Sequence, residues 1–412
     1  MPKRRFYQTS HLVLGLGMAA LMVTTAEAKQ PVSEREARAI HEAILTLDTH
    51  LDTPAVVARS GFDILQTHDW KTAFAQVDVP RMKEGGLDGG FWAIYTAQGP
   101  RTPEGLNNAR DAGLLRAVVI REMLARNPAV FGLALKADDA APIAAQGKRV
   151  VFMSIENSYP LGKDLSMMAT YYKLGVRLIG PVHFANNDFA DSSTDKVEWG
   201  GLSPLGKEFV AQANRLGMII DQSHASDQVL DQMLELSSAP IIASHSGCKA
   251  IYDHPRNLDD ARLKALAAKG GVIQMNAYGS YLKALPQSDE RNAALAELSK
   301  AYPNPGTLPA AKVDEFRKAR LALDETYPEN RATFDDFMAH LLYAIRLIGV
   351  DHVGIGLDWD GGGGVVGLED ASKVWKITQA LLAEGYSKQD IEKIWSGNVL
   401  RVMREVEAKA AR

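Results

Sequence analysis

Short apolar runs alternate with longer amphipathic stretches from about residue 41 to the end of the chain. The apolar runs are nearly continuous, which is typical of strands buried on both faces of a parallel sheet. The stretches between them repeat apolar residues at three- and four-residue spacing, and several close on a glycine, as helices commonly do. The predicted strands cover residues 43–52, 86–95, 149–157, 176–183, 217–224, 239–246, 271–277 and 352–361.

Eight strands that alternate with helices predict the α/β class and, within it, a (β/α)8 TIM barrel. No break in composition and no fixed-period repeat divides the chain, so we expect a single domain over residues 29–412. Residues 281–333 interrupt the alternation because they are polar, helix-prone and contain five prolines. We predict a helical insertion there, which could serve as a lid or be an inert excursion.

The amino terminus predicts a secretory signal peptide over residues 1–28. A basic start, "MPKRR", precedes a short apolar stretch, and small residues at Ala26 and Ala28 suit cleavage after Ala28. The apolar stretch is too short to span a bilayer comfortably. We therefore expect an exported protein, periplasmic or secreted, with no stable membrane span after cleavage. An uncleaved N-terminal anchor is the alternative.

The bulk composition narrows the range of partners. The chain has 412 residues, 46% of them hydrophobic and 23% charged, with a formal net charge of −4. These values are ordinary for a globular protein and give no reason to expect a nucleic-acid or anionic-membrane partner. Cys248 is the single cysteine, so no internal disulfide can form.

Polar side chains that bind metals or move protons lie at six of the eight predicted strand ends. In a parallel barrel these ends share one face, where barrel enzymes place their chemistry. One buried histidine alone would more often be a structural residue bonded to backbone. Six such ends are hard to explain by packing. The residues are His50 and Asp52, Glu156, His183, His224, His245 and Asp358.

Five of these residues suit a pair of zinc ions. Side chains alternate along a strand, so His50 and Asp52 project to the same side and can bind one ion together. His224 and His245, from neighbouring strand ends, can bind a second ion. Glu156 has two oxygens and can bridge both. Neutral imidazoles with carboxylates favour zinc.

A site that binds two such metals would indicate a hydrolase. Metals about 3.5–4 Å apart can share a water and lower its pKa, so that the bridging hydroxide attacks the substrate. Asp358 would accept the proton of that water and pass it to the leaving amine. This layout resembles a metal-dependent amidohydrolase.

The motifs narrow this further. The stretches "LDTHLDTP", "SIEN", "DQSH", "ASHS" followed eleven residues later by "RN", and "GIGLDWDG" lie at these strand ends. Together they resemble the membrane (renal) dipeptidase family, peptidase family M19, over residues 40–405 apart from most of the insertion. The resemblance implies an exported bacterial metalloprotease that hydrolyses dipeptides, L,L and as a further option L,D, with a homodimer left open.

The resemblance also implies roles for individual residues. His183 would contact the substrate carbonyl and stabilise the oxyanion. Arg256 would bind the terminal carboxylate of the substrate, a role that its planar guanidinium suits. Asp358 would be the acid and base, and Tyr278 would line the pocket. By the same resemblance, His50 and Asp52 would hold one zinc and the other two histidines the second.

One departure from the family leaves an alternative open. Asn157 follows the bridging glutamate where the family usually has glycine, and a side chain there could narrow the pocket. With the insertion, it motivates an N-acyl amino acid deacylase or a periplasmic peptide-tailoring amidohydrolase with the same metal site. A non-catalytic binding protein is a third hypothesis, against which the intact ligand set argues. Asp360, His254 and His340 are interpreted as structural residues.

Overall fold

The computed structural model describes residues 1–2, 31–303 and 310–410. The predicted signal peptide, apart from its first two residues, therefore lies outside the described residues. Within the described ranges, no helix is both long enough and apolar enough to cross a bilayer.

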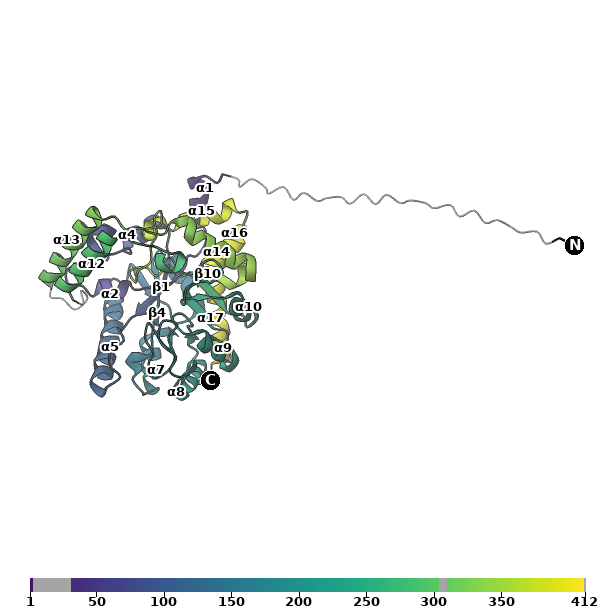
Figure 1. Cartoon of the computed structure of the whole chain (residues 1–412), viewed down its shortest axis with the longest axis horizontal. Coiled ribbons are helices and arrows are strands. Elements are labelled where there is room, and N and C mark those ends of the chain that lie inside the picture. Colours follow the sequence, from purple (N-terminus) through teal and green to yellow (C-terminus); the bar gives the residue numbers. More distant parts are fainter. Residues whose placement is uncertain (3–30, 304–309, 411–412) are drawn as a thin grey trace.

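Parallel strands close into the predicted barrel (Figure 1). One sheet has the order β1-β2-β4-β5-β6 and the other contains β10-β9-β7. Parallel bridges join β6 to β7, at Asp221 and Ile242, and β1 to the segment after β10, at Leu51 and Trp359. The barrel strands are β1 (Leu47–Leu51), β2 (Gly89–Ile94), β4 (Arg149–Ile155), β5 (Val176–Ile179), β6 (Ile219–Ile220), β7 (Ile242–Cys248), β9 (Val272–Met275) and β10 (Val353–Ile355).

Each predicted strand overlaps one of these barrel strands, so the prediction of a (β/α)8 barrel is confirmed. Two short strands add to it: β3 (Phe131–Leu133) pairs with β4, and β8 (Asn257–Leu258) pairs with β7. The barrel strands are buried along their whole length, which explains why their sequences are almost continuously apolar.

Helices surround the strands (Figure 1). Many begin at a Ser, Thr or Asp whose side chain accepts a hydrogen bond from a backbone N–H of the first turn, as Ser203 and Ser226 do. They are α1 (Glu34–His41), α2 (Thr53–Val57), α3 (Trp70–Ala73), α4 (Val79–Gly85), α5 (Pro103–Arg126), α6 (Ala140–Ala145), α7 (Ser166–Leu174), α8 (Pro204–Leu216), α9 (Asp227–Leu236), α10 (Asp260–Ala268), α11 (Gly279–Leu282), α14 (Phe334–Ile348), α15 (Trp375–Ala383), α16 (Lys388–Glu392) and α17 (Asn398–Lys409).

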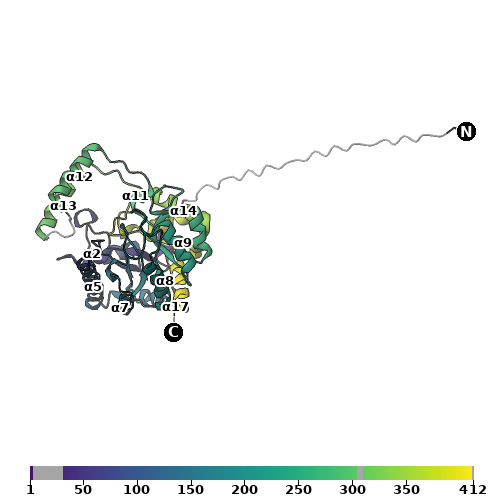
Figure 2. The ribbon, with the colours of Figure 1, turned by 60° about the horizontal axis from the view of Figure 1, so that its bottom comes forward.

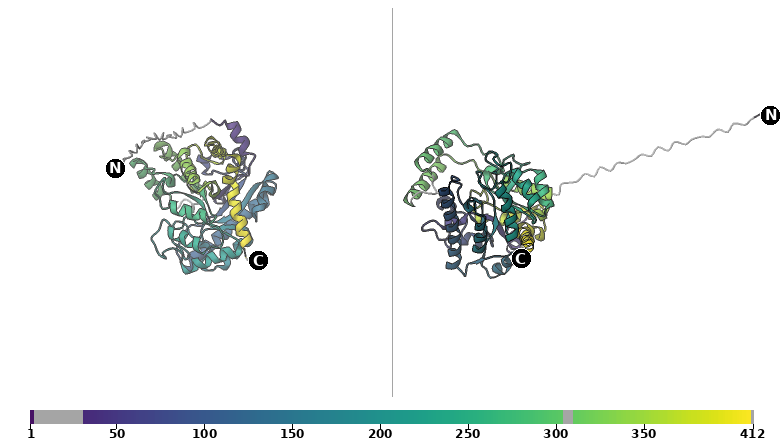
Figure 3. Two further views of the ribbon diagram at one scale, coloured as in Figure 1. Left: turned by 90° about the vertical axis from the view of Figure 1, so that its right-hand side faces the viewer. Right: turned by 90° about the horizontal axis from the view of Figure 1, so that it is seen from below.

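The final helix covers the amino-terminal ends of the strands. α17 packs against β6, β9 and β10, and Figure 3 shows it in yellow against the barrel. Val399, Val402, Met403 and Val406 of α17 belong to the same buried cluster as Leu47, at the start of β1. This end of the barrel is therefore filled by apolar side chains, and polar chemistry is left to the other end.

Residues 281–333 contain a helical hairpin. α12 (Asp289–Ala301) and α13 (Ala310–Thr326) pack against each other, and Figure 2 shows the pair standing away from the barrel. Arg291 of α12 is buried and forms an ion pair of 2.7 Å with Asp324 of α13. It also donates to the backbone oxygen of Tyr327. α13 contacts α3, so the hairpin reaches the first βα segment of the barrel.

Candidate metal centre

Four histidines from separate strand ends converge on one carboxylate oxygen. Glu156 directly follows β4, and its Oε1 lies 3.1 Å from Nε2 of His224 and 3.2 Å from Nε2 of His183. The Nε2 atoms of His50 and His245 lie 3.6 and 3.7 Å from the same oxygen. All five side chains are buried. The structure therefore gathers at one point residues that lie far apart in the sequence, from His50 to His245.

Two aspartates complete one side of this cluster. Nε2 of His50 lies 3.4 Å from Oδ2 of Asp52, and ligand atoms of His50, Asp52 and Asp358 all lie within 4.8 Å of one another. A Cβ on Gly361 would lie 2.1 Å from Oδ2 of Asp52 and 2.3 Å from Oδ1 of Asp358. Only a glycine leaves room there for the two carboxylates to approach each other.

Local backbone irregularities place several of these side chains. The register of β1 shifts between Asp48 and Leu51, where His50 lies, and that of β7 shifts between Ala243 and Ser246, where His245 lies. Such irregularities re-aim side chains and are common beside active sites. His224 and Asp358 have left-handed backbones, with φ of 72° and 63°. That conformation is unfavourable for residues other than glycine and clusters at functional sites.

The donor set fits metal ions. Nε2 of His50, Oδ1 of Asp52 and Oε2 of Glu156 are buried with no hydrogen-bond partner among the described residues. Buried polar atoms without partners are costly, so they indicate a missing ligand. Nε2 of His224 also lies 2.8 Å from Nε2 of His245. Two imidazole lone pairs that face each other need a proton or a cation between them.

The predicted pairing of ligands with ions stays a prediction. His245 and Glu156 form one possible ligand group with His50, and Glu156 forms another with His183 and His224. The ring of His245 has its centroid 3.8 Å from that of His50 and 4.9 Å from that of His224. The predicted ligands thus lie together, in an arrangement that allows more than one division between two ions.

The electrostatics differ across the cluster. Burial, reinforced by the charge of Arg256, moves the pKa of His224 well below its usual range. Burial and the neighbouring His50 do the same for the pKa of His245. Burial also lowers the pKa of His50, but the carboxylates of Asp52 and Glu156 outweigh it and raise that pKa to about 10. Neutral imidazole is the form that binds metal, so the β6–β7 side is ready for a cation.

Arg256 brings a positive charge next to the metal ligands. Its side chain is buried, its Nη2 donates to the backbone oxygen of His245 at 3.0 Å, and its Nε has no partner among the described residues. The guanidinium lies over the ring of Tyr281, which stacks on Tyr278. His254 accepts a hydrogen bond from the backbone N–H of Arg256. A buried cation with free donors is suited to an anionic group of a ligand.

Asn157 does not extend the site. Its Oδ1 accepts a hydrogen bond from the backbone N–H of Tyr159 at 3.1 Å, and its Nδ2 donates to the backbone oxygen of Thr96 at 2.9 Å. The side chain therefore joins two loops and is fully occupied by them. The expectation that it narrows the pocket beside the metals is not supported.

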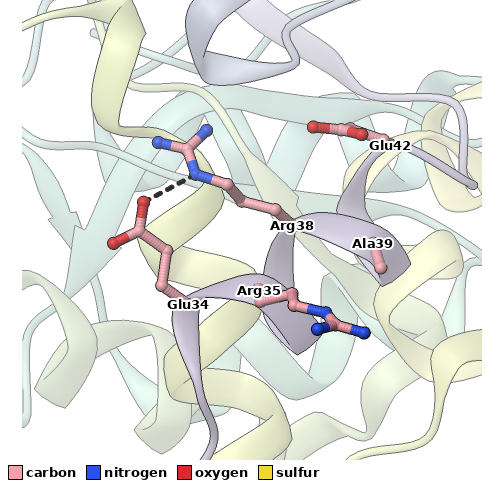
Figure 4. Close-up of a pocket in the computed structure, with 5 residues that line it drawn as sticks. All are labelled: Glu34, Arg35, Arg38, Ala39 and Glu42. Atoms are coloured by element: carbon pink, nitrogen blue, oxygen red, sulfur yellow. Dashed lines mark hydrogen bonds and ion pairs between the residues drawn. The ribbon is translucent and has the colours of Figure 1, made fainter.

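Two of the residues interpreted as structural, Asp360 and His340, have partners that are not candidate metal ligands. Asp360 accepts hydrogen bonds from Oγ1 of Thr53 and the backbone N–H of Gln76. His340 accepts one from the backbone N–H of Cys248. Both side chains therefore hold loops together. A surface hollow on α1 (Figure 4), lined by Glu34, Arg35, Arg38, Ala39 and Glu42, contains none of the predicted residues.

Aromatic residues at the cluster were missed from the sequence. The ring of Phe184 lies 4.0 Å from that of His183 and 5.0 Å from that of His224, yet Phe184 is 47% exposed. The ring of Tyr95 lies 5.1 Å from that of His183. The signal for Phe184 was present, because an apolar residue directly after a strand-end histidine is expected to line the mouth of a barrel.

Comparisons with known proteins agree with this geometry. The sequence model of the family described as "Membrane dipeptidase (Peptidase family M19)" matches residues 34–412. Dipeptidase tcpJ of Claviceps purpurea is 32% identical over 351 residues, which cover 83% of this chain and 72% of that protein. The crystal structure of the probable dipeptidase PvdM from Pseudomonas aeruginosa superposes with a TM-score of 0.78 and 33% identity, over 91% of this chain and 98% of that one.

A more distant structure shares the fold. The metallo peptidase from Rhodobacter sphaeroides, solved with a phosphinate mimic of the dipeptide L-Ala-D-Ala, has a TM-score of 0.67 at 23% identity, over 88% of this chain and 99% of that one. The family match spans the barrel and every residue of the cluster. The chain therefore belongs to the membrane dipeptidase family, peptidase family M19, and is a hydrolase of the metallopeptidase class.

Proposed function

We propose that the protein is a dinuclear zinc dipeptidase that hydrolyses the amide bond of dipeptides. The observation that carries this proposal is the convergence of four imidazole Nε2 atoms within 3.7 Å of Oε1 of Glu156. Burying such a set without cations is unfavourable, and metal ligation satisfies its free lone pairs.

In this proposal the metal ligands divide by strand. His50 and Asp52 would hold one ion, His224 and His245 would hold the other, and Glu156 would be a ligand common to both. When bound, two zinc ions would supply Lewis acidity that lowers the pKa of a bound water toward neutrality.

Arg256 sets the length of the substrate. Its guanidinium donates to the backbone of His245, so the carboxylate that it binds lies close to the metal ligands. A substrate anchored there has room for about one residue between its carboxylate and the bond that is cleaved. This short distance favours dipeptides over longer peptides.

Two further side chains act on the reacting bond. His183 lies 3.2 Å from Glu156 and faces the exposed ring of Phe184, a position from which its imidazole can stabilise the oxyanion. Asp358 lies on the opposite side with Asp52 and accepts the proton of the attacking water. It then returns this proton to the leaving amine. Tyr278 lines the side of the pocket next to Arg256.

The test is metal analysis coupled to a dipeptide screen. Protein that starts at Lys29 is loaded with zinc and incubated with a library of L,L and L,D dipeptides. We expect two zinc ions per chain and release of free amino acids, with longer peptides left intact. A zinc-loaded sample that leaves the whole library intact would contradict the proposal.

The exposed ring of Phe184 favours a second candidate, hydrolysis of N-acyl amino acids. Such substrates keep the carboxylate for Arg256 but present an apolar acyl group that could pack on Phe184. Of the two grounds from sequence, the insertion remains, whereas Asn157 is lost because its side chain is held by backbone groups. Rates on matched pairs of dipeptides and N-acyl amino acids separate the two functions.

We also propose that the protein is exported and loses residues 1–28. The support is the order of a basic start, an apolar stretch and small residues before Lys29. Sequencing the amino terminus of the protein recovered from outside the cytoplasm tests this. Recovery of a chain that begins at Met1 would contradict the cleavage.

A further inference from the structure

A buried chain of hydrogen bonds leads from Asp221 through Ser244 to His245. Oγ of Ser244 donates to Oδ2 of Asp221 at 2.5 Å and lies 2.8 Å from Nδ1 of His245. The three side chains are at most 2% exposed. Asp221 follows β6 and Ser244 lies on β7, so these hydrogen bonds also join the segment that leads to His224 with the strand that carries His245.

The direction of each hydrogen bond can be worked out from the donors. Oδ1 of Asp221 accepts hydrogen bonds from the backbone N–H of Ser223 at 3.0 Å and of Ser244 at 2.8 Å. Backbone N–H groups can only donate, so Oδ1 is committed as an acceptor. The hydroxyl of Ser244 has one proton, which it gives to Oδ2.

This direction determines the tautomer of His245. Because the hydroxyl proton of Ser244 is used by Asp221, its oxygen can only accept from the imidazole. Nδ1 of His245 must therefore carry the proton, and the lone pair lies on Nε2. Nε2 is the atom that faces Glu156 and His224.

We propose that Asp221 and Ser244 are positioning residues that hold His245 in the tautomer able to bind metal, and so set the affinity of the ion that His245 binds. The proposal rests on the metal site of the proposed function. Neither residue touches the substrate or the ion. Partners of this kind typically change metal affinity by about 10–100-fold when they are removed.

Asp221→Asn should reverse the direction of the hydrogen bonds that run from His245 through Ser244 to residue 221. The amide oxygen of the new side chain must stay with the two backbone N–H groups, so its NH2 group faces Ser244 and donates to the hydroxyl oxygen. The hydroxyl then donates to Nδ1 of His245, and the imidazole proton moves to Nε2, where it blocks the metal. We expect zinc affinity to fall about 100-fold.

Ser244→Ala acts differently, because Nδ1 of His245 loses its hydrogen-bond acceptor but does not gain a donor in its place. The imidazole can still carry its proton on Nδ1, so we expect zinc affinity to fall by only about 10-fold. The double variant Asp221→Asn/Ser244→Ala should behave like Ser244→Ala, because the reversed donor no longer has a hydroxyl to act through. If Asp221 and Ser244 had only a structural role, adding Ser244→Ala to Asp221→Asn would not restore zinc affinity.

The experiment measures zinc affinity of the whole chain by competition with a chelator, and the histidine tautomers by 15N NMR. Ser246→Ala is the matched control, since this buried serine of β7 contacts Oγ of Ser223 and has no bond to an imidazole among the described contacts. Asp191→Asn is the second control and should keep the wild-type zinc affinity, because Asp191 is also a buried carboxylate that accepts from backbone N–H groups, none of which belongs to a candidate metal ligand. Thermal unfolding reports whether each variant is folded.

We expect the highest zinc affinity for wild type and Ser246→Ala, a lower affinity for Ser244→Ala and the double variant, and the lowest for Asp221→Asn. In Asp221→Asn, Nε2 of His245 should carry the proton. Equal affinities for Ser244→Ala and Ser246→Ala would overturn the proposal, even if Asp221→Asn does not fold. A double variant weaker than Asp221→Asn would also overturn it. Wild-type protein that binds no zinc and cleaves no dipeptide would instead contradict the proposed function itself.

Discussion

The two sides of the candidate centre are built from different chemistry around one glutamate. On the β1 side, His50 faces the carboxylates of Asp52 and Asp358, and its pKa rises to about 10. On the β6–β7 side, His224 and His245 face each other, and burial lowers the pKa of both. One side is rich in negative charge and the other is neutral next to a cation, Arg256.

The difference shows how one site can separate two tasks. In the proposed function, negative charge on the β1 side would stabilise a cation and provide a base, Asp358, for proton transfer. The neutral β6–β7 side leaves the charge of Arg256 uncancelled, so that it can bind the carboxylate of a substrate. Glu156 is shared by both sides, which is why we expect it to be essential to both.

The largest expected effect comes from removing Glu156, the carboxylate that the two sides share. Glu156→Ala should lose both zinc ions and reduce dipeptide hydrolysis to the limit of detection, because each ion loses a ligand. Metal analysis and activity assays on the same sample check this. Wild-type protein treated with a chelator is the control and should regain activity when zinc is returned. A variant that keeps one zinc would show that the two sides are independent.

Asp358→Asn should remove the general base of the β1 side while the metal on that side stays bound. Burial raises the pKa of Asp358, which makes its carboxylate a stronger base than that of an exposed aspartate. We expect kcat to fall by about 10²–10⁴-fold, the usual contribution of a general base. Zinc content should stay near that of the wild type. Unchanged turnover would remove Asp358 from the mechanism.

Paired variants on the two sides sharpen the comparison. His50→Ala and His245→Ala should each lose one zinc more readily than the other, and the zinc that remains should differ between the two variants. Anomalous scattering at the zinc edge from crystals of each variant identifies the occupied position. A fully loaded and active His50→Ala variant would contradict the assignment of His50.

Arg256→Lys should weaken substrate binding while the metals remain. The ammonium keeps the positive charge but loses the planar pair of donors that binds a carboxylate in two places. We expect KM for dipeptides to rise about 10-fold, which is about 1.4 kcal/mol of binding free energy, with a smaller change in kcat. Dipeptide amides, which lack the carboxylate, are the control, and their poor hydrolysis should be the same in both proteins.

The last prediction concerns a buried histidine outside the centre and has no expected effect on activity. Burial lowers the pKa of His41 to about 4, whereas its usual value is 6.5. The unfolded chain therefore binds more protons between these values, so the free energy of unfolding falls as pH drops from 6.5 toward 4. His41→Asn should flatten this dependence, by up to about 1.4 kcal/mol per pH unit. Urea unfolding of both proteins at several pH values checks it, and parallel curves would contradict it.

Much of this site was predictable because barrel geometry is regular. The apolar runs locate the strands, and the polar residue that ends each run must lie at the carboxyl face. This reasoning reaches His50, Glu156 and Asp358 from sequence alone. It reaches Arg256 only through the family resemblance, because an arginine in a loop before a helix has no distinguishing pattern.

The remainder depends on contacts between distant segments. The register shifts at His50 and His245 follow from how neighbouring strands pair, which periodicity does not encode. From sequence, the side chain of Asn157 could have narrowed the pocket, but hydrogen bonds to the backbone of neighbouring loops hold it instead. The link from Asp221 to His245 needs β6 and β7 side by side, so no local pattern could indicate it.

The position of α17 has a consequence for how the protein is made. Its apolar face completes the cluster at the amino-terminal ends of the strands, including the first residue of β1. A ribosome must therefore have synthesised the chain through α17 before this end of the barrel can close. Until then, Leu47 and its neighbours lack the apolar face of α17, so the nascent chain needs protection from aggregation until α17 has been synthesised.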